Sequence, residues 1–328
     1  MRNRHLWLGA LCTAAIHTLA APLAQAAAYP ERPIRVIVPY APGGGPDVLA
    51  RKASDALAKE LGAAVVVENK VGAGGMLAGE FAARAPADGY TVLLGSSSHV
   101  TQKVLQPKLG FDPVTDFVHV TRTGFSPSVL VVKADAPYAS AQALIDAAKS
   151  AATPFNFGSG GIGSAAQLAG AAFSHAAGAT TLHIPYRGSV EIVPALIRGD
   201  VQFAFPVSST ALPQIKDGLV RPLAVTSAER LPQLPDTPTL NEVFGRKDLV
   251  LDSWSGAWVP AGTPADVVQR LNAAFRKVYS DPEQIEFSAR VGTLVSTTET
   301  PAEFTQFVQQ ETEKYQRIIA DNKIEIGQ

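Results

Sequence analysis

The sequence contains little cysteine and little charge. Its one cysteine, Cys12, falls in an apolar N-terminal stretch, so the rest of the chain has no thiol for catalysis, disulfide formation or metal binding. Charged residues make up 17% of the chain, and the formal net charge is −1. This balance argues against a nucleic-acid-binding surface or a polybasic membrane patch. Small molecules and other proteins are therefore the expected partners.

Motifs for common cofactors and catalytic sites are also missing. Residues 158–163 match Gly-x-Gly-x-x-Gly, but the acidic residue that would hold a ribose about 20 positions later is absent. The chain has no Walker phosphate loop and no Gly-x-Ser-x-Gly nucleophile turn. Its histidines lack the paired spacing of metal ligands. We therefore expect no cofactor, no metal site and no enzymatic activity.

The N-terminus has the features of a signal peptide. Arg2 and Arg4 precede an apolar stretch from Leu6 to Ala21, and the small-residue sequence Ala24-Gln25-Ala26 follows. The stretch is too short and too poorly flanked for a permanent transmembrane helix. Residues 1–26 are thus predicted to be a signal peptide, and a disulfide-free exported chain favours a bacterial periplasm.

At three places an apolar, strand-like run leads into a glycine-rich turn that opens a helix. These junctions lie at residues 36–47, 65–75 and 155–164. Glycine lets a ligand approach the backbone, and a helix N-terminus offers unpaired N–H groups with a partial positive charge. Each junction could therefore hold a carboxylate or phosphate by its main chain. Such glycines can also serve backbone geometry alone, and this is the favoured interpretation of the second junction.

Strand-like and helix-like segments alternate along the chain. The middle part predicts strands near residues 129–132, 155–157, 181–185, 201–205 and 221–225, and helices near 140–150, 164–177, 188–198 and 209–217. This alternation is typical of mostly parallel sheets covered by helices. About 300 residues without the signal peptide suit two α/β lobes better than one core.

Five motifs occur in order over essentially the whole chain after residue 26. They are Pro39-Tyr40-Ala41-Pro42-Gly43-Gly44-Gly45-x-Asp47, Val67-Glu68-Asn69-Lys70-x-Gly72-Ala73-Gly74-Gly75, Pro86-x-Asp88-Gly89-Tyr90-Thr91, Ile184-Pro185-Tyr186-Arg187-Gly188 and Pro260-Ala261-Gly262-Thr263-Pro264. In this combination the chain resembles the Bug family, the periplasmic solute receptors of tripartite tricarboxylate transporters.

The resemblance implies an α/β, two-lobed periplasmic binding protein of the type II-like "Venus flytrap" kind. Its mixed, mostly parallel sheets would form two lobes with a ligand cleft between them. We place lobe one at residues 29–128 and 251–328 and lobe two at residues 129–250, with hinge candidates at Val129–Val132 and Leu249–Trp254. Ligands in the family are mostly organic acids, held largely by backbone amides and ordered water. A membrane permease is the implied partner, and we expect a monomer.

The first and third junctions would then contact the ligand from opposite lobes. The predicted ligand-binding residues are Tyr40, Pro42, Gly43, Gly44, Asp47, Ser96 and Ser98 in lobe one, and Ser159, Gly160, Gly163, Ser164, Pro206 and Val207 in lobe two. Asp47 is as well suited to bond the N–H groups of its own helix. Arg187 could pair with a carboxylate, with a surface group or between lobes, and is left out of the predicted site.

One departure from the family bears on the ligand. Pro206-Val207-Ser208 stands where related receptors commonly place an acidic or amide residue, so an obvious partner for an ammonium group is missing. We expect a mono- or dicarboxylate, with an aromatic body also allowed, in preference to an amino acid. Two alternatives stay open: a ligand sensor for a two-component signalling system, which would share the cleft, and an exported hydrolase.

Overall fold

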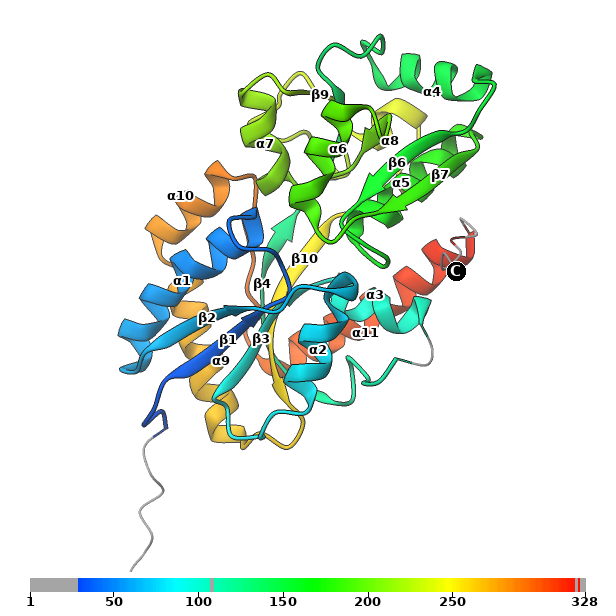
Figure 1. Ribbon diagram of the computed structural model, residues 1–328. Helices are drawn as coiled ribbons and strands as arrows, with labels where there is room; N and C mark the ends of the chain where they lie inside the picture. Colours follow the sequence, from blue (N-terminus) through cyan, green and yellow to red (C-terminus); the bar gives the residue numbers. More distant parts are fainter. Residues whose placement is uncertain (1–28, 107–108, 322–323, 325–328) are drawn as a thin grey trace, which may run out of the picture.

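The protein forms two mixed β-sheets whose faces are covered by helices (Figure 1). The computed structural model describes residues 29–106, 109–321 and 324, and the predicted signal peptide lies outside them. Within these residues one sheet has six strands, ordered β11-β4-β10-β3-β1-β2, and the other has five, ordered β7-β6-β8-β5-β9. The second sheet is built from one continuous part of the chain, between β4 and β10.

The strands are β1 (Ile34–Val38), β2 (Val65–Asn69), β3 (Thr91–Ser96), β4 (Phe117–Ser126), β5 (Val129–Lys133), β6 (Phe155–Ser159), β7 (Thr181–Pro185), β8 (Phe203–Ala204), β9 (Val220–Val225), β10 (Ser253–Pro260) and β11 (Leu294–Val295). The α-helices are α1 (Gly45–Leu61), α2 (Met76–Ala83), α3 (Ser98–Leu105), α4 (Ala141–Ser150), α5 (Ala165–Ala177), α6 (Ile192–Arg198), α7 (Ser208–Lys216), α8 (Leu240–Phe244), α9 (Ala265–Tyr279), α10 (Pro282–Arg290) and α11 (Pro301–Asp321). Two short 3₁₀ turns are η1 (Ala73–Gly75) and η2 (Ser189–Glu191).

Local signals account for the first helix. Pro46 lies in the first turn of α1, where the missing N–H costs nothing. Ala53, Leu57 and Leu61 then recur on one face and are buried. The helix ends before Gly62, whose φ of +74° is the left-handed conformation that glycine adopts without strain. The strands and helices predicted for residues 129–225 are likewise present, with small shifts at their ends.

The sheets are mixed, as predicted, but fewer strand pairs are parallel than expected. Parallel pairing is found in β2-β1-β3 and in β7-β6-β8. In contrast, β10 runs antiparallel to β3 and β4, and β5 runs antiparallel to β8 and β9. The reason is the chain path: β4 leads out of the first sheet towards the second and β10 returns, so the two neighbours point in opposite directions (Figure 1).

The two connections between the sheets are held together by Thr226. Its hydroxyl accepts a hydrogen bond from the Ser128 amide at 2.8 Å and donates one to Asp252 Oδ1 at 3.1 Å. The predicted hinge candidate 129–132 lies within β5, and the candidate 249–254 runs into β10. The exact lobe boundaries stay a prediction.

Each sheet has its own buried core. Phe173, Phe203 and Phe205 pack together in the five-stranded part, and Trp254 and Trp258 pack in the six-stranded part. Burying such a side chain contributes about 1.5–3 kcal/mol to the free energy of folding, so each part is stabilised by its own core. No helix among the residues described has the length and apolarity needed to cross a bilayer.

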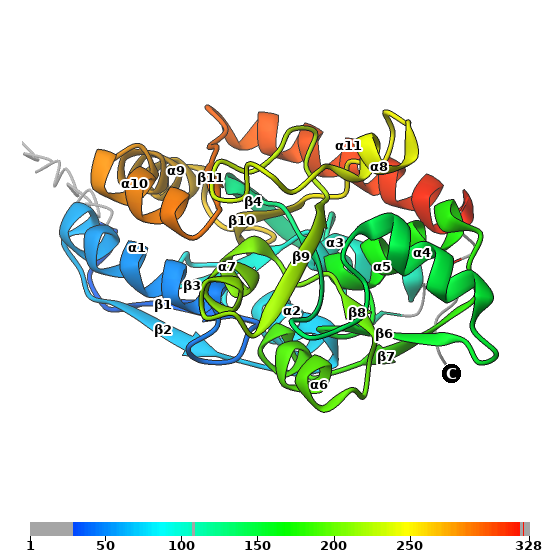
Figure 2. The same ribbon diagram turned by 90° about the horizontal axis from the view of Figure 1, so that it is seen from above.

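The two parts touch directly across the space between them. In Figure 2, seen from above, α7 of the second part lies beside α1 of the first. Thr101 Oγ1 in α3 donates to the Gly163 carbonyl. The Gln102 amide nitrogen donates to the Ile162 carbonyl at 2.5 Å and to the Gly74 carbonyl at 3.2 Å, using both of its hydrogens. These bonds join the glycine-rich turns of the two parts.

Candidate functional site

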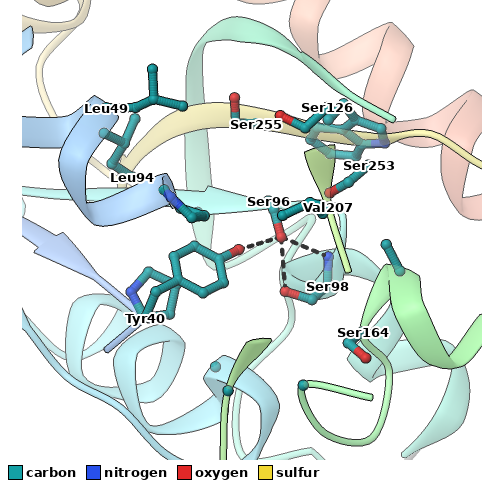
Figure 3. Close-up of a pocket in the computed structure, with 18 of the residues that line it drawn as sticks. Tyr40, Leu49, Leu94, Ser96, Ser98, Ser126, Ser164, Val207, Ser253 and Ser255 are labelled. Carbon is teal, nitrogen blue, oxygen red and sulfur yellow. Dashed lines mark hydrogen bonds between the residues drawn. The ribbon is translucent and has the colours of Figure 1, made fainter. Parts of the chain in front are cut away.

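The main cavity lies between the two sheet-bearing parts and encloses about 1020 Å³, counting its mouth open to solvent (Figure 3). Both parts contribute to its wall. The lining residues are Pro39, Tyr40, Pro46, Leu49, Ala50, Gly74, Gly75, Leu94, Gly95, Ser96, Ser98, Thr123, Ser126, Gly160, Ser164, Ala165, Ala166, Arg187, Gly188, Pro206, Val207, Ser253, Trp254, Ser255 and Tyr279. The wall is thus mainly apolar side chains and hydroxyls, a combination typical of small-molecule sites.

Seven of the thirteen predicted ligand-binding residues line this cavity. They are Tyr40, Ser96, Ser98, Gly160, Ser164, Pro206 and Val207. Three of them form a hydrogen-bonded cluster, which Figure 3 shows with dashed lines.

In this cluster the Tyr40 hydroxyl donates to Ser96 Oγ. Ser96 Oγ also lies 3.0 Å from Ser98 Oγ and accepts from the Ser98 amide at 3.3 Å. Burial raises the pKa of Tyr40, although hydrogen bonds with the two serines act in the opposite direction. The phenol is therefore neutral at physiological pH and keeps a proton with which to donate.

The other six predicted residues are not part of the cavity wall. They are Pro42, Gly43, Gly44, Asp47, Ser159 and Gly163. The two side chains among them that could best have bound a ligand, Asp47 and Ser159, are both directed into the protein.

Asp47 is committed to its own turn. Its carboxylate is 2% exposed and accepts hydrogen bonds from the Gly43 amide at 2.9 Å, Arg51 at 3.0 Å and Asn69 at 2.7 Å. Burial alone would raise the pKa of Asp47, but these hydrogen bonds outweigh it and hold the pKa below its usual value. An ionised, fully bonded Asp47 fixes the loop before α1, which is the structural role that its position also allowed.

Ser159 supports the glycine-rich turn of the third junction from inside. It is fully buried, donates to the Gly161 carbonyl at 3.1 Å, and accepts from the Gly161 amide at 3.2 Å. His183 Nε2 lies 2.6 Å from the same hydroxyl, and burial lowers the pKa of His183 to about 4. A serine and histidine are thus paired, but the serine is sealed from the cavity, so the pair shapes the turn and offers no nucleophile to a substrate.

The main chain at Gly163 is also occupied. Its amide donates to Gln167 Oε1 at 2.7 Å, and its carbonyl accepts from Thr101. With φ of +76° and side chains of α3 close by, the position accepts glycine but would strain any other residue.

Sequence reasoning missed a row of hydroxyls on β4 and β10. Thr123, Ser126, Ser253 and Ser255 all line the cavity, and Thr123 Oγ1 lies 2.7 Å from Ser255 Oγ. A signal was present: Ser253 and Ser255 are two residues apart, so in a strand they point to the same face. Because the sequence analysis predicts no strand at these positions, the spacing of the two serines did not identify them as cavity residues.

The cavity also receives the first turns of several helices. Pro46 and Leu49 belong to the start of α1, Ser98 to α3 and Ala165 to α5, while Gly75 directly precedes α2. Val207 precedes α7 in the same way. The dipoles at these helix starts favour a negative charge in the cavity.

Among the residues described, the lining contains one charged side chain, Arg187, and no carboxylate. Gly74 and Gly75 of the second junction line it too, although that junction was favoured as purely structural. No cluster of three or more potential metal ligands occurs within residues 29–106, 109–321 and 324. The arrangement can bind a small anion with an apolar body.

Comparisons with known proteins agree with this picture. Residues 49–324 match the model of the tripartite tricarboxylate transporter family receptor. The UPF0065 protein in the tcbD-tcbE intergenic region of Pseudomonas sp. (strain P51) is 35% identical over 301 residues, which are 92% of this chain and 89% of that protein.

Solved structures give the same result. The periplasmic binding protein BugD is 33% identical with a TM-score of 0.86, and the match covers 90% of this chain and 99% of that one. R. palustris Rpa4515 with adipate is 28% identical with a TM-score of 0.86, covering 90% and 99%. MatC from Rhodopseudomonas palustris with bound malate is 28% identical with a TM-score of 0.83, covering 89% and 100%.

The family and these structural neighbours are binding proteins of transporters and not enzymes. The chain therefore belongs to the receptor family of the tripartite tricarboxylate transporters, to which the Bug proteins belong, and is a periplasmic solute-binding receptor.

Proposed function

We propose that this receptor captures a small organic carboxylate and delivers it to the membrane permease of a tripartite tricarboxylate-type transporter. The observation that carries the proposal is the convergence of helix N-termini on a cavity whose described lining has one guanidinium and no acidic side chain. A carboxylate in this position gains from N–H donors and helix dipoles and meets no like charge.

The lining also favours an acid over an amino acid. An ammonium group would need a carboxylate or several carbonyl acceptors, and the wall offers mainly hydroxyls and apolar side chains. Pro206 and Val207 occupy the place where an acceptor would be useful, and they fit against the body of the ligand. Adipate in Rpa4515 and malate in MatC support a mono- or dicarboxylate as the ligand class.

Capture would work by closure of two lobes, residues 29–128 with 251–328 and residues 129–250. Tyr40, Ser96 and Ser98 would contact the ligand from lobe one, and Gly160 and Ser164 from lobe two. Pro42, Gly43, Gly44, Asp47, Ser159 and Gly163 would act indirectly, by fixing the turns that present these groups. Closure around a charged ligand expels water and strengthens each of these polar contacts.

Isothermal titration calorimetry on the chain without residues 1–26 tests the binding step. We expect adipate, malate or a related acid to bind, and glutamate and aspartate to bind at least about tenfold more weakly. Tyr40→Phe removes one cavity hydroxyl and should weaken binding, whereas Tyr138→Phe, outside the cavity wall, should not. Tight binding of an amino acid with no binding of simple dicarboxylates would contradict the proposed ligand class.

Delivery to a permease is tested in the host cell. Deletion of the gene should abolish uptake of the labelled acid that the purified receptor binds, and expression of the receptor should restore it. The sensor alternative predicts unchanged uptake together with loss of a transcriptional response to the same acid. That second outcome would keep the ligand and replace the transporter as its destination.

A further inference from the structure

Arg187 is placed by a tight turn at the edge of the cavity. Strand β7 ends at Pro185, and the Tyr186 amide donates to the Ser159 carbonyl at 2.9 Å. This bond anchors the chain beside the glycine-rich turn of the third junction. Arg187 and Gly188 follow directly, and both line the cavity before the chain enters η2 and α6.

The guanidinium of Arg187 has no carboxylate partner among the residues that the structure describes. Its main-chain amide donates to Glu191 Oε2 at 3.2 Å, but no ion pair involves its side chain. Arg198, nearby in the same lobe, contrasts with it because its guanidinium pairs with Asp200 at 2.7 Å. Arg187 is thus an exposed cation whose charge is available to a ligand.

The turn that bears Arg187 lies beside Gly44 of the other lobe, and Gly161 of its own lobe lies between it and Gly74 of the other lobe. A Cβ placed on Gly44 would lie 3.2 Å from Val190 Cγ1, three residues after Arg187. A Cβ on Gly161 would lie 3.3 Å from Gly74 Cα and 3.4 Å from the Tyr186 carbonyl oxygen. Arg187 therefore lies where the lobes meet, and a ligand clamped between them is within the region that its long side chain samples.

We infer that Arg187 pairs with a second carboxylate of the ligand and makes the receptor selective for dicarboxylates over monocarboxylates; this inference rests on the proposed function. One carboxylate is served by the helix N-termini and the Tyr40–Ser96–Ser98 cluster. A second would need its own compensation, and Arg187 is the one charged group that the described wall provides. An Arg–carboxylate pair can be bidentate, which adds directional preference to charge.

The wall also indicates what separates the two carboxylates. Leu49, Leu94 and Val207 line the cavity and are labelled in Figure 3 around the hydroxyl cluster. Apolar side chains favour methylene groups over polar substituents, since burial of each methylene is worth about 0.8 kcal/mol. The ligand class that fits is a dicarboxylate with an aliphatic spacer.

Adipate and hexanoate provide the test, because both have a six-carbon chain and only adipate has a second carboxylate. The affinity of each acid is measured by calorimetry for the wild type, Arg187→Gln, Arg187→Lys and Arg198→Gln. The wild type should bind adipate at least about tenfold more tightly than hexanoate. Arg187→Gln should lose about tenfold or more for adipate while its hexanoate affinity stays within about twofold.

The other variants make the result specific. Arg187→Lys keeps the positive charge but loses the planar guanidinium that can bind a carboxylate through two N–H groups. It should therefore retain part of the preference for adipate. Arg198→Gln, a loss of charge on the same lobe outside the cavity wall, should leave both affinities unchanged. Equal melting temperatures of Arg187→Gln and the wild type would show that the variant is folded.

The inference is overturned if Arg187→Gln weakens both acids equally or leaves adipate binding unchanged. If the wild type binds hexanoate as tightly as adipate, the dicarboxylate preference fails while carboxylate capture stands. If the wild type binds neither these two acids nor any other carboxylate, the proposed function fails together with the inference.

Discussion

Asp252 lies at the return connection between the two sheets, directly before β10. Thr226 Oγ1 donates to its Oδ1 at 3.1 Å. Burial raises the pKa of Asp252 to about 6 from its ordinary value of 3.8. The hydrogen bond from Thr226 and the charge of Lys314 oppose the rise, and the charge of Glu311 adds to it. At neutral pH Asp252 is therefore mostly ionised in the folded protein, but its ionisation costs more free energy there than in the unfolded chain.

The sign of the pH dependence follows from proton binding. Between pH 3.8 and about 6, the folded state holds a proton on Asp252 that the unfolded state has released. The contribution of Asp252 to stability therefore falls as pH rises through this window and is lowest above about pH 6. Each pH unit between the two pKa values corresponds to about 1.4 kcal/mol, so ionised Asp252 costs about 3 kcal/mol.

Replacing Asp252 with asparagine keeps an oxygen that can accept from Thr226 and removes the charge. We expect Asp252→Asn to raise the free energy of unfolding by about 3 kcal/mol at pH 8 and to change it little at pH 4. Urea denaturation at both pH values measures the difference. Asp55→Asn, on the exposed face of α1, serves as the control and should have no comparable effect at either pH.

The reasoning would be refuted if Asp252→Asn had the same stability as the wild type at pH 8, or lower. A gain that was equal at pH 4 and pH 8 would also refute it. The first result would mean that the carboxylate is stabilised by its neighbours after all. The second would mean that the gain has a cause other than ionisation.

Three further predictions concern lobe contact and acid stability. A Cβ on Gly45 would lie 2.3 Å from Ser209 Oγ and 2.9 Å from the Ser209 carbonyl carbon. Gly45→Ala should therefore hinder closure and weaken ligand affinity about tenfold, as measured by calorimetry. Unchanged affinity would contradict this. Gln102→Ala loses the hydrogen bond to Ile162 and should weaken affinity by about 0.5–1.5 kcal/mol, with a larger radius of gyration in X-ray scattering of the free receptor; equal radii would count against the role. Burial lowers the pKa of His183 to about 4, so its contribution to stability, about 3 kcal/mol, is lost as pH falls from about 6.5 to 4. In urea denaturation, His183→Gln should lose less unfolding free energy than the wild type over this pH range. An unchanged pH profile would exclude this cause.

Much of the architecture could be predicted because its signals are local. The start, periodicity and end of α1 are all encoded within residues 45–62, and the same holds for most elements of residues 129–225. The motifs that resemble the Bug family predicted the family itself. The binding of an anion by main-chain groups at the turn-and-helix junctions stays a prediction.

The direction in which each side chain points was harder to predict from the sequence. Asp47 and Ser159 belong to the glycine-rich junctions, yet both point inward because neighbouring groups of the protein take up their hydrogen-bonding atoms. Those partners, such as Asn69 and His183, are more than twenty residues away in sequence. No pattern within a single junction contains this information.

The sequence by itself determined the family and most strands and helices of residues 129–225, and it predicts an export signal at its start. Only the tertiary structure decided which side chains face the cavity. The antiparallel pairing of β4 with β10 brings Thr123 beside Ser255, 132 positions later, and lobe contact brings Arg187 to a wall otherwise without charge. The physical reason is that helix starts and glycine turns depend on neighbouring residues, whereas a binding-site wall depends on contacts between distant ones.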